Sequence, residues 1–123
     1  MRPILRIPAL FIALALVAGP AAAQDLRFLA ETPYAYFKKE DKAIFSKALN
    51  DALESAADGE TKAWSNPKTN AGGQLKALKS YEAKGLKCRT LHIANKAQGR
   101  ANEGDYNFCK QASGKWAIAG IAK

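Results

Sequence analysis

The chain has 123 residues and a formal net charge of +8, a length that suits one domain with one modest core. It contains two cysteines and one histidine, and the spacing of Cys88 and Cys109 matches no zinc-binding motif. The composition therefore argues against a metal centre and favours a structural disulfide. No cofactor is expected.

The first 23 residues are typical of a secretory signal peptide. Arg2 and Arg6 provide the positive start, residues 7–17 form an apolar run, and residues 21–23 are alanines that suit a cleavage site. The apolar run is shorter than the about 20 residues that a membrane-spanning helix needs, so a transmembrane anchor is the weaker interpretation. Cleavage after Ala23 would make Gln24 the first residue of the mature chain. Gln24 is not a cysteine, so it is not a lipid-attachment site. We expect an exported protein without a lipid anchor and without a transmembrane span, located in the periplasm or at the outer membrane or cell surface.

Residues 24–38 show no clean periodicity and are predicted to form an irregular arm, whose aromatic side chains either pack on the core or contact a partner. An α+β domain over residues 39–123 follows. From residue 39 to residue 57 the apolar residues recur with the period of an amphipathic helix. We expect the helix to end at the left-handed position offered by Gly59. Its apolar stripe consists of Phe45, Ala48, Leu49, Ala52, Leu53 and Ala56.

After Gly59, short strand-like runs alternate with turn signals, which predicts an antiparallel meander of four to five strands with the helix against one face. A loop rich in turn-forming residues is predicted at 66–73. Its glycine pair resembles a phosphate-binding loop only superficially, because no GK[ST] motif follows. The predicted strands cover residues 61–65, 75–81, 86–97, 101–111 and 115–121.

A two-residue turn at Gln98-Gly99 would place Cys88 directly opposite Cys109 on neighbouring strands. Alternation of the ladder makes this a non-hydrogen-bonded pair with Cα atoms about 4.5 Å apart, within reach of a disulfide. A bulge near Gly104 would break this register. The register also places Leu91, Ile93, Tyr106 and Phe108 on an apolar face that the helix should cover, joined by Trp116 and Ile118.

The same register places His92 opposite Asp105, where a carboxylate-oriented imidazole can in principle act as a general base. No serine or cysteine nucleophile stands beside it. A polar cross-strand pair on a solvent-facing surface is the simpler interpretation, and we expect no enzymatic activity.

Basic residues are concentrated in the sheet region, which is far more cationic than the helix. They either keep the sheet soluble and guard its edges, or form a docking face for an anionic envelope polymer such as lipopolysaccharide or the cell wall. Nucleic acid is not an expected partner of an exported protein. Nothing in the sequence predicts an oligomer, so a monomer is assumed.

Several short motifs, in order, resemble the bacterial 17 kDa outer-membrane surface antigen family. They follow the helical segment 41–56 and comprise Gly59-Glu60-Thr61, Trp64-Ser65-Asn66-Pro67, Gly72-Gly73, Cys88-Arg89, Cys109-Lys110 and Gly114-Lys115-Trp116. The resemblance implies an envelope-associated, immunologically visible domain with no established enzymatic activity. It also implies that the two cysteines pair.

Two functions from different classes are compatible with these observations. The first is a non-catalytic envelope protein that recognises an anionic component, with Trp64, Arg89, Lys110 and Trp116 as candidate contacts. The tryptophans are alternatively part of the core, given the area that each can bury. The second is a periplasmic module that binds another protein, as an inhibitor or a chaperone-like partner.

Overall fold

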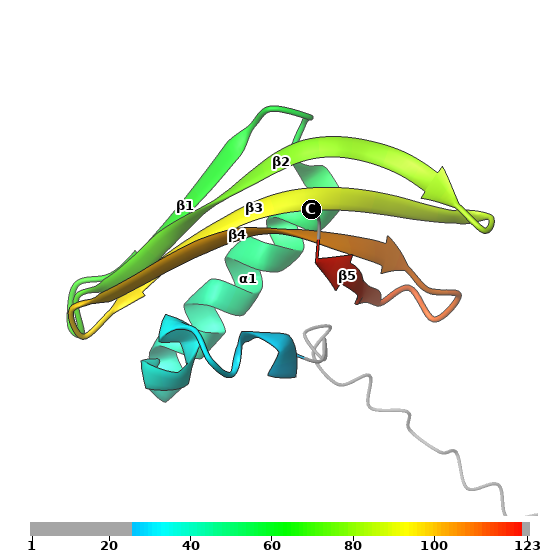
Figure 1. Cartoon of the computed structure of the whole chain (residues 1–123). Coiled ribbons are helices and arrows are strands. Elements are labelled where there is room, and N and C mark those ends of the chain that lie inside the picture. Colours follow the sequence, from blue (N-terminus) through cyan, green and yellow to red (C-terminus); the bar gives the residue numbers. More distant parts are fainter. Residues whose placement is uncertain (1–25, 122–123) are drawn as a thin grey trace, which may run out of the picture.

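The structure is a computed structural model that describes residues 26–121; the predicted signal peptide lies outside these residues. One α-helix packs against one face of a five-stranded antiparallel sheet (Figure 1). None of the described helices is both long and apolar enough to cross a membrane. The elements in chain order are the 3-10 helices η1 (Arg27–Leu29) and η2 (Pro33–Tyr36), helix α1 (Lys39–Ser55), and strands β1 (Thr61–Asn66), β2 (Ala71–Ala83), β3 (Leu86–Ala97), β4 (Arg100–Lys110) and β5 (Trp116–Ile121).

The strands pair in sequence order, β1-β2-β3-β4-β5, so the predicted α+β meander is confirmed. Strands β3 and β4 pair without interruption from Cys88↔Cys109 to Ala97↔Arg100, and no bulge occurs at Gly104. The turn between them is the predicted one, since Gln98 and Gly99 both have positive φ values of 51° and 76°. A disulfide joins Cys88 to Cys109 with Cα atoms 4.0 Å apart, which confirms the predicted pairing.

The predicted apolar stripe of α1 is buried against the inner face of the sheet. That face supplies Leu75, Leu91, Ile93 and Phe108, which are at most 2% exposed. Trp116 belongs to this core and Ile118 packs against it, as expected. The opposite, outer face of the sheet is not covered by α1 (Figure 1).

The segment before α1 is more ordered than the predicted irregular arm, because it contains two 3-10 helices. The Thr32 hydroxyl accepts a hydrogen bond from the backbone of Tyr34 and thereby caps η2, which begins with Pro33. Aromatic side chains then fasten the segment to the core: Phe28 packs on Phe108, with ring centroids 5.8 Å apart. These contacts lie far apart in the sequence, so periodicity could not reveal them.

Helix α1 ends at Ser55 rather than at Ala57, and Gly59 does not cap it. The helix is followed by Ala56 in an extended conformation, while Gly59, with φ of 92°, lies in the turn that leads into β1. The backbone amide of Gly59 donates to the Ala77 carbonyl at 2.6 Å. The glycine therefore serves the turn into the sheet and not the helix end.

The loop predicted at 66–73 is also shorter than expected, because strand β2 already begins at Ala71. Gly72 and Gly73 lie inside β2, opposite Ser65 and Trp64 of β1. A side chain at Gly73 would come within 2.5 Å of Asn95 Oδ1. Close packing between the strands therefore explains the glycine pair. In the sequence alone, the same pair looks like part of a turn. Strand β3 has the predicted bounds, and each of the other remaining strand ends lies within two residues of its prediction.

Candidate functional site

Glu54, in the last turn of α1, is the centre of a polar cluster that joins the helix to β4 and β5. Its carboxylate accepts hydrogen bonds from Trp116 Nε1 at 2.6 Å and forms an ion pair with Lys110 Nζ at 3.0 Å. The hydrogen bond from Trp116, followed by that from Lys110, lowers the pKa of Glu54. Trp116 is only 5% exposed, so its indole packs in the core while its N–H satisfies the carboxylate.

Arg89 reaches the same end of α1 from β3 and is 7% exposed. Its Nη1 donates to the carbonyl oxygens of Ala52 at 2.9 Å and Leu53 at 3.2 Å, and its Nη2 pairs with Asp58 at 3.0 Å. The last carbonyls of a helix have no partners within the helix and carry its partial negative charge. The Arg89 guanidinium therefore caps the C-terminus of α1, where the sequence predicts a glycine cap.

The disulfide fixes the relative positions of these groups, because Arg89 follows Cys88 and Lys110 follows Cys109. Both cysteines are buried. A cavity of about 410 Å³ lies beside this junction. Three of the four predicted contact residues, Arg89, Lys110 and Trp116, thus meet at one place, and each of them is bonded to another part of the protein.

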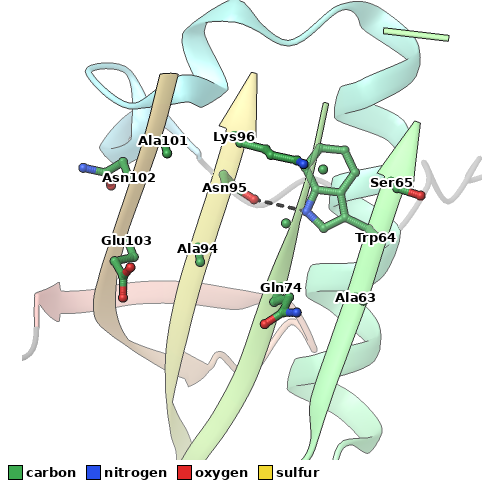
Figure 2. A pocket seen from close by; sticks show the side chains of 12 residues that line it. Ala63, Trp64, Ser65, Gln74, Ala94, Asn95, Lys96, Ala101, Asn102 and Glu103 are labelled. Atoms are coloured by element: carbon green, nitrogen blue, oxygen red, sulfur yellow. Dashed lines mark hydrogen bonds between the residues drawn. The ribbon is translucent and has the colours of Figure 1, made fainter. Parts of the chain in front are cut away.

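Trp64, the fourth predicted residue, lies elsewhere, toward the N-terminal half of α1. It is 6% exposed and packs edge-to-face against Phe37 and Phe45. Its Nε1 donates to Asn95 Oδ1 at 3.1 Å, across the position of Gly73 (Figure 2). The absence of a side chain at Gly73 is what allows this bond.

A second polar cluster, which the sequence did not reveal, holds the start of α1. The Asp41 carboxylate accepts hydrogen bonds from Asn66 Nδ2 at 2.7 Å, Thr69 Oγ1 at 2.6 Å and the Lys38 backbone at 2.7 Å. Burial alone would raise the pKa of Asp41, but these hydrogen bonds outweigh it and lower the pKa. The sequence feature that could have revealed this cluster is the position of Asp41. It precedes Phe45 by four residues and therefore lies on the buried stripe of α1.

The outer face of the sheet contains a shallow groove of about 630 Å³ over strands β1 to β4 (Figure 2). Two rows of residues that are adjacent across the strands, most of them small, form its floor. One row runs Ser65, Gly72, Lys96 and Ala101, and the next runs Ala63, Gln74, Ala94 and Glu103. The small side chains hollow this face, while Lys96, Gln74 and Glu103 provide polar groups.

His92 lies opposite Asp105 on this face, as the register predicted. Its Nδ1 is 2.6 Å from Asp105 Oδ1 and its Nε2 is 3.0 Å from Glu103 Oε1. The hydrogen bond to Asp105 is the main cause of a raised pKa for His92. Both ring nitrogens are therefore engaged by carboxylates. Within residues 26–121, no group of three or more metal-binding side chains is found.

Lysines gather where the β2–β3 hairpin and the β4–β5 turn project beyond α1, at one end of the sheet (Figure 1). We call this group the basic end. Among the described residues, Lys110 is the member that forms an ion pair. Lys79 instead lies 5.5 Å from the ring centroid of Tyr81. The basic end comprises Lys79, Lys84, Lys87, Lys110 and Lys115.

Comparison with known proteins identifies one family. Neither the curated proteins nor the solved structures give a significant match. A family model described as 17 kDa outer membrane surface antigen matches residues 51–117, which is more than half of the 123 residues. The matched region contains Trp64, both cysteines and Trp116. The chain therefore belongs to the 17 kDa outer membrane surface antigen family.

Proposed function

We propose that this protein is an exported, non-catalytic envelope protein that docks on an anionic envelope component through the basic end of its sheet. The observation that carries the proposal is the concentration of lysines at that end, where Lys84, Lys87 and Lys115 have no ion-pair partner among residues 26–121. The family description, an outer membrane surface antigen, supports the location in the envelope.

The internal bonding of the motif residues supports the choice of this surface. Arg89 donates to helix carbonyls, and Trp64 and Trp116 are buried with their N–H groups satisfied. All three side chains are buried, and the one polar atom among them that lacks a partner, Arg89 Nε, is buried too, so they offer no exposed polar group to a polymer. Exposed lysines on a projecting hairpin, in contrast, attract phosphates and carboxylates over a distance of about one Debye length.

The geometry around His92 supports a role without catalysis. A general base needs a free nitrogen that can reach a substrate proton, whereas both nitrogens of His92 face carboxylates. The neighbouring side chains on the outer face, Thr90 and Asn107, bond to each other at 2.6 Å. No activated nucleophile is formed by this arrangement.

The proposal is tested by measuring binding of the purified protein to purified lipopolysaccharide and to purified cell-wall fragments at low and high salt. Reversing two charges with Lys84→Glu and Lys87→Glu should weaken binding at least about tenfold, since each lysine near an anionic surface contributes about 1 kcal/mol. The matched control is Lys39→Glu with Lys47→Glu, which changes the net charge equally on the helix. Equal weakening by both pairs, or binding to neither polymer, would contradict docking through the basic end.

A further inference from the structure

Strand β1 has an open edge. It pairs with β2 on one side, and among residues 26–121 no strand pairs with its other side. Open edges present unpaired N–H and C=O groups and are usually protected by lysines, prolines or bulges. Within β1 there is no proline or bulge, and its one lysine, Lys62, forms an ion pair with Glu60 at 3.2 Å.

The opposite edge of the sheet, β5, differs from β1. Its pairing with β4 contains an irregularity between Asn107 and Phe108, and Gly120 has φ of 152°. Such an irregularity interrupts a regular ladder and discourages the addition of another strand. The two edges are therefore not equivalent, and β1 is the one suited to pairing.

The outer-face side chains of β1 are small and exposed: Thr61, Ala63 and Ser65. Each belongs to a row that crosses the sheet. Thr61 is followed by Lys76 on β2, and Ser65 is followed by Gly72 and then by Lys96 on β3.

Both of these lysines are exposed and have no ion-pair partner within the described part of the chain. Because Gly72 has no side chain, Lys96 extends from β3 over β2 toward β1 (Figure 2). A strand added to β1 would lie about 9.6 Å from β2, which brings its long side chains within reach of Lys76.

We propose that β1 accepts an extended, acidic segment of another protein as a sixth strand. An acidic side chain opposite Thr61 pairs with Lys76, and a second acidic side chain opposite Ser65 pairs with Lys96. A small residue lies between them, opposite Ala63. Because Thr61 and Ser65 are four residues apart, the recognised pattern is acid-x-small-x-acid. Main-chain hydrogen bonds supply affinity and the two lysines supply specificity.

A second copy of this chain fits the same edge less well. Antiparallel pairing of β1 with another β1 would offer Thr61, Ala63 and Ser65 to the two lysines, and none of these residues carries a carboxylate. The two chains would also each bring a formal net charge of +8. Charge complementarity therefore favours a different, acidic partner.

The test uses synthetic nine-residue peptides with the pattern Glu-x-Ala-x-Glu and fluorescence anisotropy with the purified protein. The Glu peptide should bind at least about tenfold more tightly than the same peptide with both glutamates replaced by lysine. Lys76→Glu with Lys96→Glu should remove this preference. The control Lys84→Glu with Lys87→Glu should leave it unchanged, and the Lys76/Lys96 variant should still bind the anionic polymer, which separates this proposal from the previous one.

Two N-methylated peptides distinguish strand addition from simple charge attraction. Alternate amides of an added strand face β1, so methylating one alternate set should abolish binding and methylating the other set should preserve it. Equal behaviour of the two methylated peptides would overturn the proposal. So would a concentration-dependent dimer, seen by analytical ultracentrifugation, that Ala63→Lys separates, because the occupant of the edge would then be a second copy.

Discussion

The buried carboxylate of Asp41 allows a sharp test of how α1 is held at its start. Asp41 is 1% exposed and accepts three hydrogen bonds. Its neighbour Glu40 is exposed, and among residues 26–121 its one ion-pair partner is Lys68, at 3.9 Å. Both acids lie in the first turn of the same helix. Asp41→Asn and Glu40→Gln therefore remove the same charge from nearly the same place in two different environments.

Asparagine at position 41 keeps one acceptor oxygen but turns a donor toward the Lys38 N–H. One charged hydrogen bond is lost and two become neutral, which together cost about 2–4 kcal/mol; the interaction with the helix dipole adds about 0.5 kcal/mol. This is a large part of the 5–15 kcal/mol that stabilises a typical domain. The Glu40→Gln control should change the free energy of unfolding by only about 0.5 kcal/mol.

Urea unfolding followed by tryptophan fluorescence measures these differences. Because the folded-state pKa of Asp41 is lowered, its contribution to stability is present above the unfolded-state pKa and is lost as the pH falls through the folded-state pKa. The difference between wild type and Asp41→Asn should therefore be full at pH 7 and shrink in acid. Similar unfolding free energies for the two variants at pH 7, or a difference that does not shrink in acid, would refute the reasoning.

Three further predictions concern other contacts. Arg89→Met should lower the free energy of unfolding by about 3 kcal/mol, because it leaves the last helix carbonyls unpaired in a buried place, and a loss below about 1 kcal/mol would argue against its capping role. Gly73→Ala should destabilise by about 1–3 kcal/mol in the same urea assay, because the new methyl group would collide with the Ala94 carbonyl, and an unchanged midpoint would contradict the close packing. His92 has a raised pKa, so its contribution to stability is complete below its unfolded-state pKa and is lost as the pH rises through the folded-state pKa. An NMR titration should show that Asp105→Asn lowers the pKa of His92. An unchanged pKa in this variant would exclude Asp105 as the main cause of the shift.

The parts of the fold that the sequence predicted correctly depend on local periodicity. The apolar stripe of α1 repeats within one helix, and the β3–β4 register depends on a turn of two residues between strands that are continuous in sequence. Once that turn was located, the disulfide and the His92–Asp105 pair followed from counting residues.

The parts that were not predicted depend on contacts between distant segments. Asn66 bonds to Asp41 across 25 positions, and Arg89 reaches the carbonyl of Ala52 across 37. The sequence alone predicts Gly73 to be a turn former. The reason that a glycine is needed there, the passage of the Trp64 indole toward Asn95, exists only in the folded sheet. For the same reason the sequence did not show that three of the candidate contacts, Arg89, Lys110 and Trp116, meet at one place and bond to the protein itself.

The position of the family motifs separates the residues that build this domain from the two surfaces that we propose for binding. The Trp64-to-Pro67 motif fastens the start of α1 through Asn66, and the motifs at the two cysteines and at Trp116 fasten its end through Arg89 and Glu54. Exchanging side chains that hold the two ends of the helix costs stability, as the predictions for Asp41 and Arg89 state. The exposed lysines and the open edge of β1 carry no such constraint, because their side chains bond to little else in the described chain. The two proposed binding surfaces can therefore change in sequence while the helix and sheet remain as they are.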